Sequence, residues 1–172
     1  EELFAACHEH GLKLFVDGAR LAYALTSPAN DVSMADLARL SDVFYIGGTK
    51  CGTLFGEAVV IPDGGSIRQF VTQMKQHGAL LAKGRLLGVQ FKALFEDGLY
   101  STIGRPGVAA TQRIREALIR AGYVVTMDSP TNLTFVALDQ AGHERLSRKV
   151  RYGIWETLPD GRLLARFCTS WG

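Results

Sequence analysis

The sequence predicts an α/β fold followed by a smaller α+β unit. Short apolar runs alternate with helical segments over the first part of the chain, which is typical of a sheet covered by helices. One of these runs, LKLFVD (12–17), ends in an acid, as a buried parallel strand would. The later part has a long amphipathic helix followed by strands and turns. We therefore expect a large-domain part at 1–98 and a small α+β domain at 99–172.

The elements of the first part follow from local patterns. Gly11 ends a helix at 1–10 that carries Leu3, Phe4 and Cys7 as its apolar stripe. Ser33 is a good N-cap because Asp36 lies at the capping-box distance. In chain order we expect helix 1–10, strand 12–17, a short helix 19–25, a helix from Ser33 to about Ser41, strands 42–48 and 55–62, and a long helical segment 66–95 with breaks possible at its glycines.

The second part begins after a turn-rich joint at 102–107. An amphipathic helix at 108–121 points Ala109, Ile114, Ala117 and Leu118 inward, and Gly122 ends it. We then expect, in order, the strands YVVTM and TNLTFVAL, a helix at 143–150, and two strands within ETLPDGRLLARFCTSW that flank a turn at Pro159–Gly161.

Composition excludes several function classes. Apolar residues make up 47% and charged residues 21% of the 172 residues, as in an ordinary globular protein. A net charge of +2 without basic runs argues against nucleic-acid and membrane-surface binding. The three cysteines have no metal-like spacing, so we expect no metal site and read them as free thiols of a cytoplasmic protein.

A lysine within the glycine-rich segment FYIGGTKCGTLFGEAVVI (44–61) is the first candidate for chemistry. Lys50 has glycines and apolar runs around it and no acid close in sequence before Glu57. A lysine that acts as a neutral amine needs such a setting, because burial disfavours the ammonium. The alternative is a turn lysine whose ammonium reaches solvent. Cys51 beside it reads as a small buried filler.

Asp17 is the second candidate, at the predicted carboxyl end of a strand. Ligands of open α/β sheets bind at that edge, although Asp17 taken alone also suits a cap for the next helix. Lys50 follows the next strand, so an acid and an amine leave the same edge. Pyridoxal 5′-phosphate (PLP) needs this pair: a lysine for its Schiff base and a carboxylate that keeps its ring nitrogen protonated.

These motifs resemble those of the PLP-dependent aspartate-aminotransferase-like superfamily (fold type I). FVDGARLAYAL followed by YIGGTKCGTLFGEAVVI is most similar to the threonine aldolase and β-eliminating lyase group, and LLARFCTSW resembles its closing strand. The resemblance is strong at 15–25 and 43–61 and looser at 162–171. It implies the large PLP-binding domain, followed by the small domain.

The resemblance also implies roles for individual residues. Lys50 forms the Schiff base, Asp17 pairs with the pyridine nitrogen, Arg20 contacts the phenolic oxygen side of the ring or the substrate, and Thr49 helps to hold the phosphate. Arg166 clamps the substrate carboxylate, as a bidentate guanidinium can, and Arg85 matches a family arginine loosely. The alternative for Arg166 is a solvated side chain without a role, if its strand lies at the edge of the sheet and turns Ala165 and Phe167 to the core.

Some positions depart from the family pattern. Thr49 replaces the usual serine before the lysine, Cys51 and Gly52 stand where Gly-Leu is commoner, and 70–95 lacks the usual arginine-rich glycine run. The ring-stacking histidine and the glycine-rich phosphate cup of the family are upstream features. The chain starts without methionine and its ends read as interrupted elements, so we expect a piece of a longer protein with the catalytic base elsewhere.

The resemblance implies a lyase similar to L-threonine aldolase, which converts a β-hydroxy-α-amino acid into glycine and an aldehyde. β-Elimination and transamination remain open because they begin from the same cofactor–lysine arrangement. An α/β binding domain without covalent chemistry is a further alternative, although no G-x-G-x-x-G motif opens a helix here. The resemblance also implies an amino-acid substrate and a homodimer or homotetramer.

Overall fold

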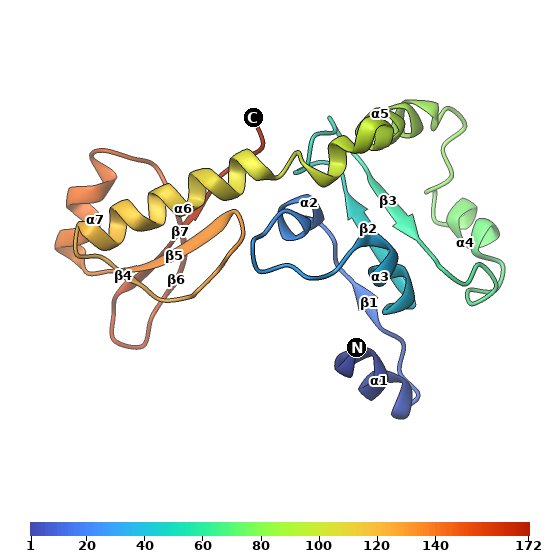
Figure 1. The fold of residues 1–172 in the computed structure, drawn as a ribbon, viewed down its shortest axis with the longest axis horizontal. Coiled ribbons are helices and arrows are strands. Elements are labelled where there is room, and N and C mark those ends of the chain that lie inside the picture. The colour runs from blue at the N-terminus through green and yellow to red at the C-terminus, as the bar shows by residue number, and fades with distance from the viewer.

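The computed structural model describes all residues 1–172, and its chain forms two sheet-containing units (Figure 1). Local signals explain several boundaries. Gly11 ends the first helix with a φ of 67°, and the Ser33–Asp36 capping box begins another. The first unit contains, in order, α1 (Glu2–Glu9), β1 (Phe15–Val16), α2 (Leu21–Leu25), α3 (Met34–Arg39), β2 (Val43–Gly47), β3 (Glu57–Val60), α4 (Phe70–Gln76) and α5 (Arg85–Phe95).

The second unit follows a 3₁₀ helix, η1 (Glu96–Ser101), and is built on the longest helix of the chain. Pro106 lies in the first turn of that helix, where a missing N–H leaves no hydrogen bond unmade. Its elements are, in order, α6 (Arg105–Arg120), β4 (Val124–Val125), β5 (Leu133–Leu138), α7 (Gln140–Ser147), β6 (Gly153–Thr157) and β7 (Leu163–Cys168). None of the helices has the length and apolarity needed to span a bilayer.

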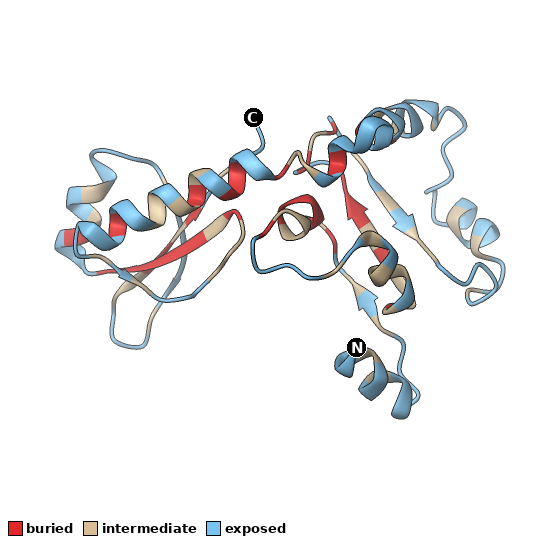
Figure 2. Cartoon of the chain, in the orientation of Figure 1, coloured by how far each residue is buried: buried red, intermediate tan, exposed pale blue.

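The three-stranded sheet of the first unit has the order β1-β2-β3, and it has one buried face. β1 and β2 are parallel, with Val16 beside Phe44, whereas β2 and β3 are antiparallel. Phe44 and Ile46 face a core that also contains Tyr23 and Phe91. The buried residues of this unit gather on β2 and α2 (Figure 2). The opposite face is open: Phe15 of β1 lies on this face and is 58% exposed.

The four-stranded antiparallel sheet of the second unit has the order β4-β5-β7-β6. Helix α6 runs along this sheet (Figure 1). Leu118 of α6 packs with Val136, Ala165 and Phe167, which point to the same face of the sheet. The α/β class predicted from sequence is therefore confirmed, and the α+β pattern of the second part is present.

Several predicted elements differ in extent. The run 12–17 forms only the two-residue strand β1 and is not buried, because Phe15 belongs to the open face. The segment 66–95 is two helices, since Gly78 adopts a φ of 69° between them. Helix α1 buries none of its residues fully: of its predicted apolar stripe, Phe4 and Cys7 are half-buried and Leu3 is exposed.

Close backbone packing joins the two units near the start of α6. A Cβ on Gly104 would lie 2.4 Å from the carbonyl oxygen of Ala22, and one on Gly107 would lie 2.9 Å from the ring of Tyr23. Both glycines therefore allow α6 to approach α2 more closely than any side chain would permit. The C-terminal stretch also meets this joint, because the Thr169 hydroxyl donates to the carbonyl of Gly107 at 2.6 Å.

Candidate active site

The two central candidates follow parallel strands at the same sheet edge. Asp17 comes directly after β1, and Lys50 lies three residues after β2. Because β1 and β2 run parallel, their carboxyl ends meet at one edge. In open α/β sheets, ligands bind in the crevice beyond that edge.

Glycines bring the two connections into direct backbone contact. The amide of Gly47 donates to the carbonyl of Gly18 at 2.9 Å. A Cβ on Gly47 would lie 2.5 Å from the Gly18 oxygen and 2.6 Å from the Ala19 oxygen. Only glycine fits this approach, so the spacing between the Asp17 turn and the Lys50 loop depends on it.

We expect Gly47→Ala to destabilise the protein by about 3 kcal/mol, the upper range for overpacking, because the new Cβ meets two backbone oxygens that cannot rotate away. Urea denaturation measures the effect. Gly88→Ala is the matched control, since Gly88 lies within α5 with open space around it. That control should be neutral or gain about 0.5–1 kcal/mol from helix propensity. Equal unfolding midpoints for Gly47→Ala and the parent would contradict the packing argument.

The main chain of Lys50 is held by the segment that carries Asp17. The Tyr23 hydroxyl donates to the carbonyl of Lys50 at 2.7 Å. The thiol of Cys51, which is fully buried, donates to the carbonyl of Ala19 at 3.7 Å. Burial raises the pKa of this thiol. Cys51 therefore fills space beside the loop, as the sequence suggested, and is not activated as a nucleophile.

The Lys50 side chain itself is exposed and forms no salt bridge. The apolar sequence around it therefore buries the loop backbone and not the amine. Glu57, the first acid after Lys50, does not neutralise it. Its carboxylate accepts a hydrogen bond from the amide of Gly48 at 2.7 Å. The amine is thus left free for a ligand at the sheet edge.

Asp17 is held as an ionised carboxylate on the open face of the sheet. Its Oδ1 accepts hydrogen bonds from the Tyr45 hydroxyl and from the amide of Ala19, the latter at 2.9 Å. These two bonds, and then the charges of Lys50 and Arg20, lower the pKa of Asp17. Helix α2 has no side-chain cap, so the capping role considered for Asp17 does not apply.

Arg20 lies beside Asp17 at the start of α2 and is half-buried. Both residues line a cavity of about 420 Å³, which Thr131 and Asn132, just before β5, and Leu133, its first residue, also line. The Thr49 hydroxyl is exposed and its only contact is a 3.5 Å hydrogen bond to the carbonyl of Gly56. Arg20 therefore joins Asp17 at a hollow between the units, whereas Thr49 faces solvent.

Arg166 lies in the second unit, on the sheet face opposite α6. Arg166 is on β7, where it pairs with Phe135 of β5 on one side and with Gly153 of β6 on the other. Strand β7 is therefore an inner strand and not the predicted edge strand. The guanidinium stacks 4.8 Å from the centre of the Trp155 ring and is half-buried, which corrects the alternative of a merely solvated arginine.

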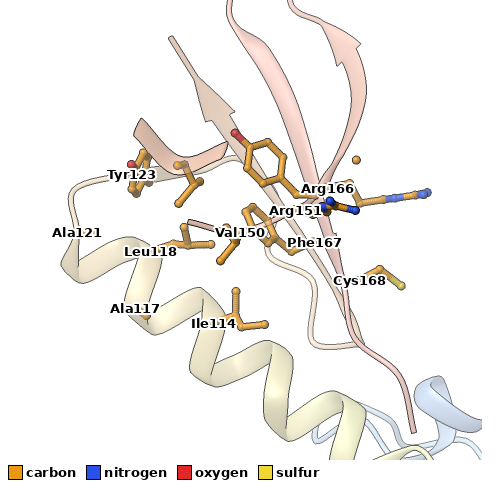
Figure 3. Close-up of a pocket in the computed structure, with 13 residues that line it drawn as sticks. Ile114, Ala117, Leu118, Ala121, Tyr123, Val150, Arg151, Arg166, Phe167 and Cys168 are labelled. Carbon is orange, nitrogen blue, oxygen red and sulfur yellow. The ribbon is translucent and has the colours of Figure 1, made fainter. Parts of the chain in front are cut away.

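A cavity of about 580 Å³ lies between α6 and this sheet (Figure 3). Its lining is mostly apolar, and Arg166 extends away from the side chains of Leu118 and Phe167. Neither Asp17 nor Lys50 borders it, so it is separate from the candidate active site. Arg85 is exposed at the start of α5, and no hydrogen bond or salt bridge links it to Asp17 or Lys50.

Three contacts of the site come from residues that sequence reasoning passed over: Tyr45, Tyr23 and Glu57. Tyr45 lies beside Asp17 because the register that pairs Val16 with Phe44 also sets Asp17 beside Tyr45 on one face, and the sequence alone does not show that register. Tyr23 and Glu57 act on backbone groups of the Lys50 loop. No sequence spacing identifies such partners.

The residues present fit PLP by their chemistry. Lys50 offers an amine without an ion pair, and Asp17 offers a carboxylate whose Oδ2 accepts no hydrogen bond within the chain. The glycines at positions 18, 47 and 48 keep the edge free of side chains, and a Cβ on any of them would meet backbone atoms within 2.6 Å. The arrangement can bind a flat ring by one charged end and attach to it covalently.

Comparisons with known proteins agree with this geometry. The chain is 36% identical over 100 residues to a low specificity L-threonine aldolase of Pseudomonas sp. (strain NCIMB 10558), covering 56% of this chain and 28% of that protein. It is 28% identical over 172 residues to a low specificity L-threonine aldolase of Pseudomonas aeruginosa, covering 97% of this chain and 48% of that protein.

Solved structures extend the comparison. A Leishmania major threonine aldolase superposes with a TM-score of 0.93 at 42% identity, and the match covers 100% of this chain and 50% of that one. Sphingomonas wittichii serine palmitoyltransferase shares the fold. It superposes with a TM-score of 0.67 at 16% identity, and the match covers 99% of this chain and 45% of that one. The chain thus spans half or less of the length of these relatives.

A model of the beta-eliminating lyase family matches residues 1–148, which is most of the chain and includes both sheet-edge motifs. The match also takes in the long helix α6 and the inner strand β5. With the parallel strand pair, the Asp17 and Lys50 connections and the superposition on the L. major enzyme, this establishes that the chain belongs to the beta-eliminating lyase family.

Proposed function

We propose that this chain is part of a PLP-dependent lyase that cleaves the Cα–Cβ bond of a β-hydroxy-α-amino acid to glycine and an aldehyde. One observation carries the proposal: the carboxylate of Asp17 and the amine of Lys50 leave the same edge of a sheet that superposes on L. major threonine aldolase. Threonine aldolases and beta-eliminating lyases depend on PLP.

The residues at the sheet edge would have separate roles in binding the cofactor and the substrate. Lys50 would hold the cofactor through its amine, and Asp17 would keep the ring nitrogen protonated because its lowered pKa maintains the carboxylate charge. Bound PLP supplies an electron sink for the pair released when Cα–Cβ breaks. Arg20, beside Asp17 in the cavity, would contact the phenolic oxygen side of the ring or the substrate. Thr49 would offer its exposed hydroxyl to the phosphate in place of its long 3.5 Å hydrogen bond to Gly56.

We assign the substrate carboxylate to Arg166, as the closing-strand motif suggests. Support comes from its half-buried guanidinium, which Trp155 orients by stacking, because a pre-oriented fork recognises a carboxylate bidentately. Arg85 remains a candidate second contact to substrate. Both assignments require these arginines to meet the Asp17–Lys50 edge in the full-length protein.

The expected result for the full-length protein with PLP and L-threonine is formation of glycine and acetaldehyde in equal amounts. The measurement is product analysis of L-threonine and L-serine reactions run side by side, with a no-PLP reaction as control. Aldol cleavage yields glycine without ammonia. β-Elimination would instead release ammonia and a keto acid from either substrate, and transamination would require an added keto acid. Either of those patterns without glycine would overturn the aldolase assignment.

We propose further that residues 1–98 are part of the large PLP-binding domain and 99–172 are the small domain. Each part contains its own sheet, and each sheet has a cluster of buried apolar side chains, which supports two domains; Tyr100 and Val108 pack into the first cluster from just beyond the boundary. Limited proteolysis tests it, because a domain boundary near residue 98 predicts cleavage around Asp97 and Gly98, which both have positive φ.

We also propose a homodimer or homotetramer in the cytoplasm, acting on a small amino acid. The more than half-exposed Phe15 and Val59 on the open sheet face support association, and the free thiols of Cys7, Cys51 and Cys168 support a reducing compartment. The molar mass of the full-length protein in solution tests the first point: a monomer would contradict it.

A further inference from the structure

Tyr45 stands out among the residues of the open sheet face because its polar end meets the candidate site. It lies on β2 between Phe44 and Ile46, which are buried, so its own side chain projects from the opposite face. Its ring packs against Phe15 of β1 at 6.0 Å between centroids. The hydroxyl then reaches the carboxylate of Asp17, which follows β1.

The two oxygens of Asp17 have different surroundings. Oδ1 accepts from both the Tyr45 hydroxyl and the Ala19 amide, which lies 2.9 Å away. Oδ2 accepts no hydrogen bond within the chain. Two donors on one oxygen fix the rotation of the carboxyl group, because the donors come from two separate segments, β2 and the turn after β1.

The charges around this pair favour a proton on Tyr45 and none on Asp17. The hydrogen bond to Asp17 is the largest cause that raises the pKa of Tyr45 to about 12, and the charge of Glu57 on β3 adds to it. Arg20 before α2 and Lys50 after β2 act in the other direction on Asp17 and lower its pKa. Tyr45 is therefore the hydrogen-bond donor of this pair and the Asp17 carboxylate is the acceptor.

We propose that Tyr45 is a positioning residue for Asp17, holding Oδ1 so that Oδ2 remains the free acceptor for a protonated ring nitrogen. The inference rests on the proposed function and deepens it, since it concerns how the acid that binds the cofactor ring is oriented. Tyr45 itself does not contact the ring in this role. It acts through the carboxylate.

The test is Tyr45→Phe in the full-length protein, because phenylalanine keeps the ring contact with Phe15 and removes only the hydroxyl. We expect the PLP dissociation constant to rise about tenfold, equivalent to about 1.4 kcal/mol. In the cofactor-free protein, carbon NMR titration of the carboxyl groups should show the pKa of Asp17 rising towards its ordinary value, because its strongest donor is gone. The ionised form would then be lost at a higher pH than in the parent.

The matched control is Tyr152→Phe, which removes a tyrosine hydroxyl that meets His143 in the second unit. It should leave both the Asp17 titration and the PLP affinity unchanged. Thermal unfolding of both variants checks that neither effect comes from loss of fold. An unchanged Asp17 pKa and unchanged PLP affinity in Tyr45→Phe would overturn the inference.

The outcome can be separated from failure of the proposed function. If the parent protein binds no PLP, the proposed function fails, while the Asp17 titration still reports whether Tyr45 controls the carboxylate. If the parent binds PLP and Tyr45→Phe binds it equally well with an unshifted Asp17, the positioning role alone fails. A shifted Asp17 pKa together with weaker PLP binding supports both.

Discussion

Lys50→Ala is expected to abolish threonine cleavage by the full-length protein, with a fall of about 10³-fold or more, because Lys50 is the amine that would hold the cofactor at the sheet edge. The visible absorbance band of lysine-bound PLP should disappear at the same time. Lys50 is exposed, so its truncation leaves the loop, which Tyr23 and Cys51 hold by backbone contacts, in place. The measurements are the rate of glycine formation and the absorbance spectrum with PLP.

Lys149→Ala is the control, since Lys149 is an exposed lysine of the second unit, just after α7. It should keep both the activity and the absorbance band. Retention of the band in Lys50→Ala would show that another amine holds PLP and would remove the basis of the proposed function. Loss of the band with an unchanged unfolding midpoint would identify Lys50 as the covalent attachment point.

Asp17→Asn should lower the rate of threonine cleavage on the order of 10²-fold or more, with a smaller effect on folding. Asparagine keeps an oxygen that can accept from Ala19 and Tyr45, yet it carries no charge to stabilise a protonated ring nitrogen. The ring nitrogen would then be less protonated and the electron sink weaker, while Lys50 could still react with PLP. We therefore expect the absorbance band of lysine-bound PLP to remain and the turnover rate to fall.

Asp63→Asn is the control for this change. Asp63 follows β3, which runs antiparallel to β2, and so it lies beyond the opposite edge of the sheet. Its carboxylate accepts from the amide of Gly65 at 3.0 Å, a contact that asparagine can also make. Turnover in Asp63→Asn should match the parent. Parent-like turnover in Asp17→Asn would contradict the assignment of Asp17 to the ring nitrogen.

Sequence patterns predicted most elements but not their extent. Ser33 and Asp36 form the expected capping box. Of the α6 residues predicted to point inward, Leu118 is buried and Ile114 is half-buried, whereas Ala109 and Ala117 are exposed, because the buried face of the helix also runs through Val108 and Thr111. The predicted strand 12–17 shrinks to β1 because its apolar side chains do not all find a core within this chain. Apolar character alone cannot reveal which face of a short strand is covered, since burial depends on what packs against it.

The candidate site shows the same division between local and long-range information. The residue types at the sheet edge and their order, Asp17 after one strand and Lys50 after the next, are local features that can be read from the chain. The sequence did not show that Lys50 is exposed. Its glycine and apolar neighbours suggested a buried amine, but they pack around the backbone of the loop and leave the side chain in solvent.

The succession of helices and strands along the chain, the capping box at Ser33 and the acid and amine that follow two strands depend on near neighbours in sequence, and the amino-acid sequence alone indicated them. The hydrogen bonds from Tyr45 to Asp17 and from Tyr23 to Lys50 join residues 28 and 27 positions apart, and they became visible only in the folded chain. The physical reason is that strand register and close glycine packing bring these partners together, and both arise only when the whole sheet assembles.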